Sequence, residues 1–129
     1  MTLGPIGQIA LHVADADRAE RFYRDALGLR PLYRFGELLF FDCDGVRLML
    51  AGGHAPRPAG DASFCVYLRA RGIEAATAAL ADRGVVFERA PHLVAKMPDH
   101  ELWMAFFRDP DNNLWALMEE KRAGDNVGV

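Results

Sequence analysis

His12 is the residue best placed to do chemistry in this sequence, because histidine titrates near neutral pH and can carry a proton. It lies in residues 6–14, where apolar side chains alternate with other types as in a β-strand. The alternation puts His12 on the same face as Gln8. We therefore treat His12 as a candidate catalytic residue. The alternative is a partly buried histidine that hydrogen-bonds a neighbour or orients a ligand.

A second group of reactive side chains falls within residues 89–101. We expect these residues to form a long loop, because the second half of the chain repeats the element order of the first half with extra residues at this place. The candidates here are His92, Lys96, His100 and Glu101, and Trp103 follows. Such a loop could close over a ligand and supply a general acid or a lysine that binds a carboxylate. The alternative is a set of solvated charges. His100 and Glu101 are adjacent, so in a strand they would face opposite sides and chelate poorly.

A helix is expected directly after the first strand. Asp17 can cap it, Glu20 completes a capping box, and Gly28 is typical of the position just past a helix end. We then expect strands near residues 30–34, 37–42 and 46–51, with Asp44 and Gly45 forming a hairpin turn between the last two.

The same order of elements then repeats, which indicates an internal duplication. Residues 52–61 are rich in glycine and proline and predict a connector. The second copy is expected to contain a strand at 62–69, a helix at 73–83, strands near 85–88, 102–108 and 114–119, and a frayed tail at 120–129. Pro110 stands where a type I turn over residues 109–112 prefers it. The chain therefore predicts one domain of two βαβββ modules, residues 6–51 and 62–119.

Two motifs at the ends of this repeat resemble a known family. The first reads Ile-Ala-Leu-His-Val-Ala-Asp over residues 9–15, followed by Ala-Glu-Arg-Phe-Tyr-Arg-Asp-Ala-Leu-Gly over residues 19–28. The second reads Phe-Arg-Asp-Pro-Asp-Asn-Asn-Leu-Trp-Ala-Leu-Met-Glu over residues 107–119. Together they resemble the vicinal-oxygen-chelate superfamily of glyoxalases, bleomycin resistance proteins and dioxygenases. Asn112 departs from the family's usual glycine, but asparagine also tolerates a positive φ.

This resemblance implies an α+β fold in which the two βαβββ modules curl into an eight-stranded cup with the helices outside. The family binds its ligand in the cup, and many members hold a divalent metal there. The four ligand positions of the family fall on Gln8, Leu48, Ser63 and Ala116. Leu48 and Ala116 have no donor atom and a neutral serine is a poor ligand, so we expect no cofactor. The alternative is a divalent metal at a relocated site.

If Gln8 points into the cup, strand alternation predicts which other side chains do so. The predicted set is Gln8, Ala10, His12, Val46, Leu48, Leu50, Ser63, Cys65, Tyr67, Leu114, Ala116 and Met118. Such an apolar bowl with few polar groups is typical of a small-molecule pocket, and equally of a filled core. Our candidate ligand-binding residues are Gln8, His12, Leu48, Ser63, Tyr67, Trp103 and Ala116.

Several of these residues have a plainer alternative. Tyr67 can donate a hydrogen bond to a ligand, whereas Cys65 is more typical of a small buried apolar side chain. Trp103 and Trp115 could both stack on an aromatic ligand. By its alternation with Ala116, however, Trp115 should point away from the cup, into helix packing or a subunit interface. His54 lies in the connector and is expected at the surface.

Composition narrows the possible partners. The chain has 129 residues, 51% of them hydrophobic and 26% charged, with a net charge of −3. The sequence contains no basic cluster interleaved with aromatic residues, so it gives no indication of nucleic-acid binding. It also contains no apolar run long enough for a membrane helix. The N-terminus does not resemble a signal peptide, so we expect a cytoplasmic protein with Cys43 and Cys65 reduced.

Two functions follow from these observations. The first is a metal-free protein of the bleomycin-resistance type, a homodimer that binds a small hydrophobic or aromatic molecule. The alternative is an enzyme, a lyase, isomerase or dioxygenase, that uses His12 and residues 89–101 or a relocated metal. The substrate is not readable from the residues.

Overall fold

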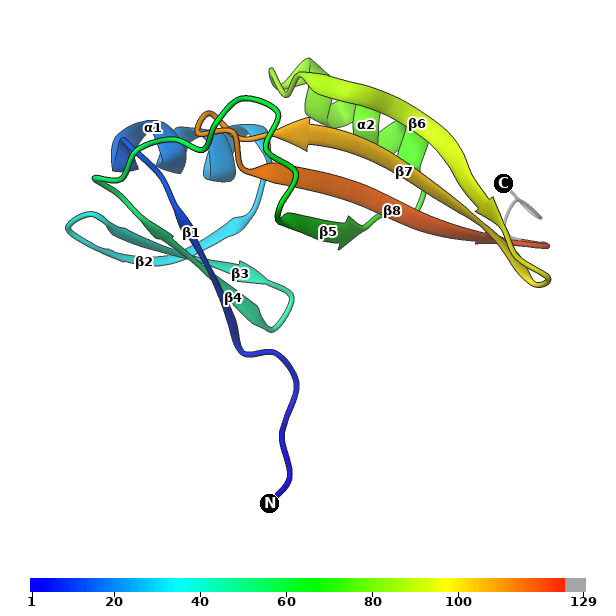
Figure 1. The fold of residues 1–129 in the computed structure, drawn as a ribbon, viewed down its shortest axis with the longest axis horizontal. Coiled ribbons are helices and arrows are strands. Elements are labelled where there is room, and N and C mark those ends of the chain that lie inside the picture. Colours follow the sequence, from blue (N-terminus) through cyan, green and yellow to red (C-terminus); the bar gives the residue numbers. More distant parts are fainter. Residues whose placement is uncertain (125–129) are drawn as a thin grey trace. The chain divides into compact units, whose positions relative to one another are not determined.

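A computed structural model describes residues 1–124 of the chain as two compact units (Figure 1). Unit 1 consists of Met1–Asp61 together with Asp109–Asn113, and unit 2 consists of Ala62–Arg108 and the residues from Leu114 onward. Each unit carries one βαβββ module with its own four-stranded sheet. The predicted α+β class and the tandem repeat are therefore confirmed.

Unit 1 contains sheet 1, with strand order β1-β4-β3-β2. Its elements are β1 (Gln8–His12), α1 (Ala16–Arg21), a π-helical continuation η1 (Phe22–Ala26), β2 (Arg30–Phe35), β3 (Leu38–Cys43) and β4 (Val46–Ala51). β1 runs parallel to β4, and the other neighbours are antiparallel. The hairpin turn at Asp44 and Gly45 is confirmed, because both residues have positive φ and Cys43 pairs with Val46.

Helix α1 begins earlier than expected. Its cap is Asp15, whose carboxylate accepts the Arg18 N–H at 3.2 Å, so the assignment of the cap to Asp17 and Glu20 is wrong. Asp17 lies inside the first turn and pairs with Arg34 instead. The helix ends as predicted before Gly28, which has a φ of 80°.

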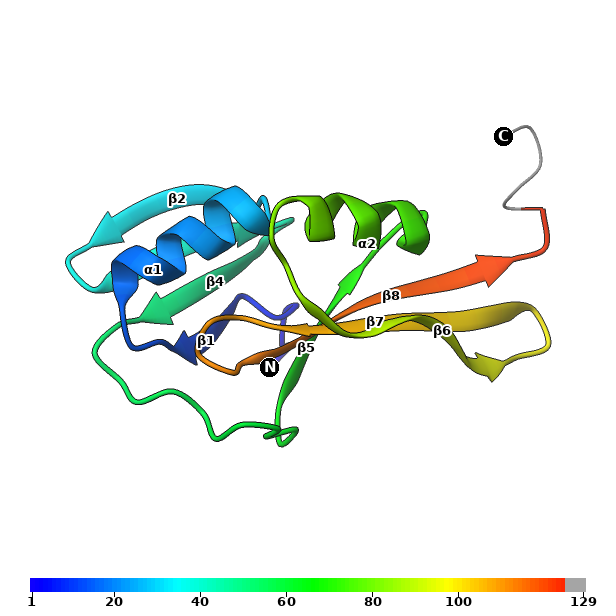
Figure 2. The same ribbon diagram turned by 90° about the horizontal axis from the view of Figure 1, so that it is seen from above.

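Unit 2 contains sheet 2, with strand order β5-β8-β7-β6. Its elements are β5 (Cys65–Arg69), α2 (Ile73–Asp82), β6 (Phe87–Lys96), β7 (His100–Arg108) and β8 (Leu114–Arg122). Figures 1 and 2 show each helix lying over one face of its own sheet. None of the helices within residues 1–124 is long and apolar enough to cross a bilayer.

The predicted loop over residues 89–101 is wrong, because these residues extend a β-hairpin. β6 and β7 pair from Phe87 with Phe107 to Lys96 with Glu101. The pairing slips at three places, which breaks the alternation by which a strand is recognised in a sequence. Pro91 fits because β6 is an edge strand, where a missing N–H costs no ladder bond.

The predicted tail also begins too early. β8 continues to Arg122, so residues 120–122 belong to the strand, and residues 125–129 of the predicted tail lie outside the described residues. The turn over residues 109–112 is confirmed by the Asn112 N–H, which donates to the Asp109 carbonyl at 3.2 Å. Asn112 takes the expected positive φ of 64°.

Candidate functional site

Each sheet has one face covered by its helix and one face that its helix does not cover, which we call the open face. Leu11, Leu48, Leu39 and Phe41 form the buried, α1-facing side of sheet 1. The strand register places six other residues of β1 and β4 together on the open face: Gln8, Ala10 and His12 beside Arg47, Met49 and Ala51. The predicted common face of Gln8, Ala10 and His12 is thus observed.

Leu48 does not share this face, so its expected position beside Gln8 is wrong. The residue paired with Gln8 is Arg47, whereas Leu48 pairs with Ile9 and with Phe41 and is only 1% exposed. A slip of one residue along a strand reverses the face of every side chain. Val46 and Leu50 are displaced from the predicted set for the same reason.

Arg47 is the polar centre of the open face of sheet 1. Its Nε donates to the Gln8 Oε1 at 2.7 Å, and its Nη1 donates to the Tyr33 hydroxyl at 2.9 Å. The guanidinium carbon lies 5.7 Å from the centre of the Phe40 ring, a cation–π distance. We did not select Arg47 or Tyr33 from the sequence. The hairpin turn was the available signal, because pairing Cys43 with Val46 puts Asp42 opposite Arg47.

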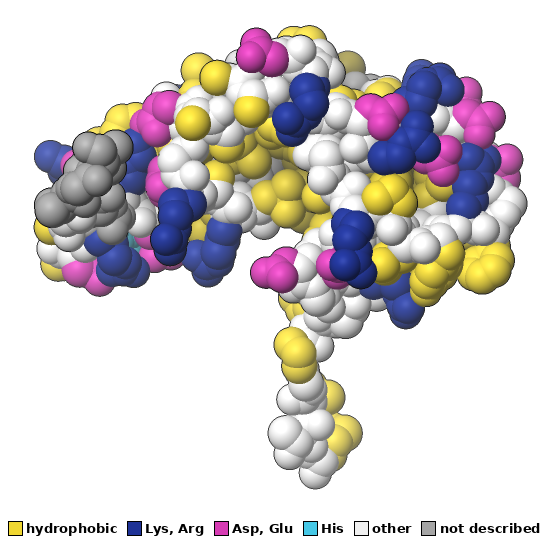
Figure 3. Space-filling model, turned by 180° about the vertical axis from the view of Figure 1, so that it is seen from behind, with side chains coloured by type: hydrophobic (Ala, Val, Ile, Leu, Met, Phe, Trp, Pro, Cys, Tyr) yellow, Lys and Arg dark blue, Asp and Glu magenta, His cyan; other side chains and the backbone are white. Residues whose placement is uncertain are grey.

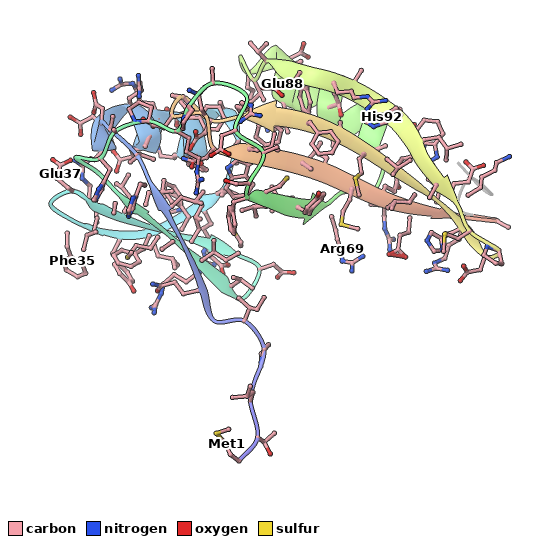
Figure 4. All side chains as sticks on the ribbon, viewed as in Figure 1. Met1, Phe35, Glu37, Arg69, Glu88 and His92 are labelled. Carbon is pink, nitrogen blue, oxygen red and sulfur yellow. The ribbon has the colours of Figure 1, made fainter. Side chains whose placement is uncertain are left out.

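Three aromatic side chains surround Arg47 on this face. The Tyr33 ring lies 4.7 Å from that of Phe40 and 5.4 Å from that of Phe35. Tyr33 is 43% exposed and Phe35 is 66% exposed, far more than aromatic rings of a core. Figure 4 shows Phe35 projecting from β2 on the side away from α1, and Figure 3 shows hydrophobic side chains beside Lys and Arg on the surface at lower right. We call Tyr33, Phe35 and Phe40 the aromatic cluster.

A shallow hollow lies at the bulge of β2, on the α1-facing side of sheet 1. Its volume is about 150 Å³, the size of a cavity that holds one benzene ring. The residues that line it are Glu20, Pro31, Leu32, Tyr33, Arg34, Leu39, Phe40 and Phe41. The bulge falls between Pro31 and Tyr33, where the pairing of β2 with β3 shifts. Glu20 belongs to α1, and Leu39 and Phe41 belong to the buried, α1-facing side of sheet 1, so the hollow does not lie on the open face.

The positive charge of Arg47 is not paired with a carboxylate within residues 1–124. Asp42 is its neighbour across the β3–β4 ladder, but the Asp42 Oδ1 accepts the Gly45 N–H at 3.0 Å. The guanidinium is directed instead at Gln8 and Tyr33, which are neutral. The open face of sheet 1 thus combines exposed aromatic rings with a cation that has no ion pair.

The residues at the expected metal positions do not fit a divalent metal. The Gln8 Oε1, the only good donor among them, already accepts a hydrogen bond from a cation. Leu48 is in the core, Ala116 has no donor atom, and Ser63 precedes β5 rather than lying in it. Among residues 1–124, no group of three His, Cys, Asp or Glu side chains has metal-binding spacing.

His12 lies at the other end of β1 from Gln8, about 13 Å away at the usual rise per residue of a strand. Its ring stacks on His54, with centroids 3.8 Å apart and an interplanar angle of 9°. Both histidines are exposed, as was expected for His54. The structure thus brings His12 together with His54 and not with Arg47. A catalytic role for His12 stays a prediction.

The open face of sheet 2 carries Tyr67, as expected, with Cys65, Ala116 and Met118 on the same side. Tyr67 is 47% exposed, and its ring meets Phe106 edge to face at 6.5 Å. Arg69 continues this face and lies 3.6 Å from Glu120; Figure 4 shows it projecting on the side away from α2. The predicted cup would join this face to that of sheet 1, and it stays a prediction.

Neither tryptophan lies on an open face. Trp115 is fully buried and stacks against Phe107, so its predicted direction away from the cup holds, but it offers no subunit interface. Trp103 pairs with Glu119, which places it on the side of Trp115, opposite Tyr67. Its Nε1 donates to Glu101 at 3.1 Å, and the Lys121 Nζ lies 4.6 Å from the ring centre. Trp103 therefore cannot share a ligand with Tyr67 or Ala116 on that face.

The ionisable residues of segment 89–101 are spread along the β6–β7 hairpin. His92 lies 6.0 Å from the Phe106 ring, while His100 hydrogen-bonds Asp99 at 2.8 Å next to the hairpin tip. The Lys96 Nζ lies 3.9 Å from the Glu101 Oε2. The structure thus gathers them at no single site, and the expected loop that would bring them over a ligand is absent from residues 89–101.

The turn Asp109–Asn113 is a buried structural device within unit 1. The Tyr23 hydroxyl donates to the Asp109 Oδ2 at 2.6 Å, and the N–H groups of Asp111 and Asn113 donate to the Asp109 Oδ1. Burial raises the pKa of Asp109, and these hydrogen bonds oppose the rise. The Asp111 Oδ1 accepts the Ala14 N–H at 2.8 Å. The acidic residues of this motif therefore serve packing, and they face no open surface.

Both cysteines are free and half-buried. Burial is the main cause that raises the pKa of each thiol. Cys65 also lies beside Tyr67 and raises the pKa of its phenol. A raised thiol pKa means little thiolate at neutral pH, so neither cysteine is suited to nucleophilic chemistry.

Comparisons with known structures find the same fold in several proteins. A glyoxalase/bleomycin resistance protein/dioxygenase from Alicyclobacillus acidocaldarius is 19% identical, with a TM-score of 0.74 over 90% of this chain and 91% of that chain. A lactoylglutathione lyase from Agrobacterium tumefaciens is 24% identical, with a TM-score of 0.69 over 92% and 95% of the two chains. TioX from Micromonospora sp. ML1 is 18% identical, with a TM-score of 0.71 over 90% and 98%.

At these identities the similarities show the fold alone, and no curated protein matches the sequence significantly. The sequence model of one family does match, over residues 5–117. That span includes the first motif, the first module, the aromatic cluster, and all but the last two residues of the second motif and of the second module. The protein therefore belongs to the Glyoxalase/Bleomycin resistance protein/Dioxygenase superfamily.

Proposed function

We propose that the protein binds a small planar aromatic molecule on the open face of sheet 1, without a metal ion. The observation that carries this proposal is the exposure of Tyr33 and Phe35, which lie in contact with each other in the aromatic cluster. Exposed aromatic side chains in mutual contact lose little conformational freedom when a further ring stacks on them. Gln8 is the only one of our predicted ligand-binding residues that contacts Arg47 here.

Binding is favoured over catalysis by the structure of residues 89–101. The enzymatic alternative needs His12 with these residues, or else a relocated metal. Residues 89–101 form a hairpin that gathers its ionisable side chains at no single site, and His12 stacks on His54. One similar structure is named a lactoylglutathione lyase and another only a glyoxalase/bleomycin resistance protein/dioxygenase, so the fold does not decide between the two functions. The homodimer and the cytoplasmic location stay predictions.

The proposal is tested with 2-naphthol, a planar aromatic compound that is neutral at pH 7. Calorimetry should give saturable one-to-one binding, unchanged by a chelator, and amide NMR shifts should centre on β2 and β3. Phe35→Ala should weaken binding roughly threefold to tenfold, the range for one aromatic pair. The matched control is Phe64→Ala, which removes an exposed phenylalanine outside the cluster. Equal loss in both variants, or shifts spread over both units, would contradict the proposal.

A further inference from the structure

At the centre of the open face of sheet 1, the acceptor atoms of Gln8 and Tyr33 already accept hydrogen bonds from Arg47. An arginine side chain can only donate hydrogen bonds, so the Gln8 amide must turn its oxygen toward the Arg47 Nε. The hydroxyl oxygen of Tyr33 likewise accepts from the Arg47 Nη1. Gln8 and Tyr33 therefore each use an acceptor atom to bind the guanidinium of Arg47.

What remains at this position are donors. The Gln8 Nε2 has only a weak contact with the Met49 sulfur at 3.9 Å, the phenolic hydrogen of Tyr33 has no acceptor within residues 1–124, and neither do the other Nη hydrogens of Arg47. All three side chains are exposed. A group of donors with a net positive charge is complementary to an atom group that only accepts and is negative.

From this arrangement we propose that Arg47, Tyr33 and Gln8 form an oxyanion site, so that the ligand of this face is an aromatic molecule carrying a carboxylate. This inference rests on the proposed function and names its ligand class. The fork of the guanidinium matches a carboxylate in geometry, and the adjoining aromatic cluster receives the ring that bears it. Arg47 supplies the positive charge beside Gln8 that a metal ion would otherwise supply.

The roles of the three residues differ. Arg47 binds the anion directly, Tyr33 adds one neutral donor, and Gln8 acts mainly as a positioning residue that holds the Nε edge of the guanidinium. Asp42, the residue opposite Arg47 in the strand register, accepts the Gly45 N–H and forms no ion pair with Arg47.

The test compares 2-naphthoate with 2-naphthol, which share a ring system and differ in charge. Calorimetry at low salt should show tighter binding of 2-naphthoate, and only this binding should weaken as NaCl is added. Arg47→Gln should reduce naphthoate affinity about tenfold and Tyr33→Phe about threefold, because a hydrogen bond from a charged donor contributes more to binding than one from a neutral donor. Both variants should lose less affinity for 2-naphthol than for 2-naphthoate, and urea unfolding checks that both remain folded.

The matched control is Arg21→Gln, which removes the same charge from α1, on the covered side of sheet 1. It should leave naphthoate affinity unchanged. Equal affinity of the parent for the two probes, or an Arg47→Gln variant that binds naphthoate like the parent, would overturn the oxyanion site while the aromatic site stands. Failure of both probes to bind would remove the aromatic site and the oxyanion site together.

Discussion

At the scale of single residues, the identity of the side chain beside Gln8 decides what the open face of sheet 1 can hold. Arg47 places a positive charge beside Gln8, where a metal site would need another ligand atom. Binding of a metal ion and binding of an anion therefore exclude each other at this position. Gln8 itself was predictable from the alternation of the first strand. Arg47 was not, because the face of β4 depends on the pairing of strands across the hairpin turn, whereas the family resemblance places Leu48 at this position.

Gln8→Glu tests this exclusion directly. The new carboxylate would pair with the Arg47 guanidinium, now 2.7 Å from the Gln8 oxygen, and cancel the charge that an anion needs. We expect 2-naphthoate affinity to fall while 2-naphthol affinity stays. Because the pair is exposed, the free energy of unfolding should change by less than about 1 kcal/mol. Calorimetry and urea unfolding measure the two quantities, and undiminished naphthoate binding would contradict the prediction.

The thiols offer a second prediction at this scale. Burial raises the pKa of both Cys43 and Cys65, so each holds less thiolate at neutral pH than a free thiol does. Alkylation by iodoacetamide, followed by mass spectrometry, should be slower than that of glutathione at pH 7.5 and should accelerate as pH rises. Rapid modification of either cysteine at pH 7 would speak against it.

At the scale of elements, the sequence predicted where strands and helices lie better than which way their side chains face. The two-residue turn at Asp44 and the glycine after η1 are local signals, and both are observed. The faces of β4 and β7 depend on pairing between strands, which local pattern does not determine. The β6–β7 hairpin was missed because its register slips, so that Leu93 and Val94 do not alternate as in a regular strand.

Helix capping supplies a prediction with a control in the same turn. Asp15 accepts the Arg18 N–H, so Asp15→Ala should lower the free energy of unfolding by about 1 kcal/mol. Asp17→Ala removes an equal charge from the same turn but only an exposed ion pair with Arg34, and should cost less. Urea unfolding distinguishes the two. A larger loss for Asp17→Ala would restore the cap predicted from the sequence.

At the scale of the whole molecule, the full burial of Trp115 means that this side chain does not offer the apolar subunit interface that was one of its two expected roles. The dimer therefore stays a prediction without that support. The motif over residues 107–119 could be recognised in the sequence, but the structural role of its polar residues could not be predicted. Asp109, Asp111 and Asn113 are almost fully buried, and their partners come from Tyr23, Ala14 and the His12 carbonyl, far away in the sequence.

The buried Asp109 makes stability depend on pH. Its folded-state pKa is raised, so its contribution to stability is greatest below the unfolded pKa and falls as pH rises through the folded value. Tyr23→Phe removes a hydrogen bond that lowers this pKa, and should cost about 1–3 kcal/mol at pH 7. The cost should be smaller near pH 4, where Asp109 is more protonated. Urea unfolding at both pH values measures it, and a pH-independent cost would contradict the assignment.

The turn Asp109–Asn113 also constrains the order in which the chain can fold during synthesis. Residues 1–61 leave the ribosome well before the turn that completes unit 1 has been made. Until then the Tyr23 hydroxyl and the Ala14 N–H lack the carboxylates that accept their hydrogens. The first module therefore stays incomplete until residues 109–113 have been synthesised. A nascent chain stalled after residue 61 should be cleaved readily by proteases, and one in which residues 109–113 have left the ribosome should resist them.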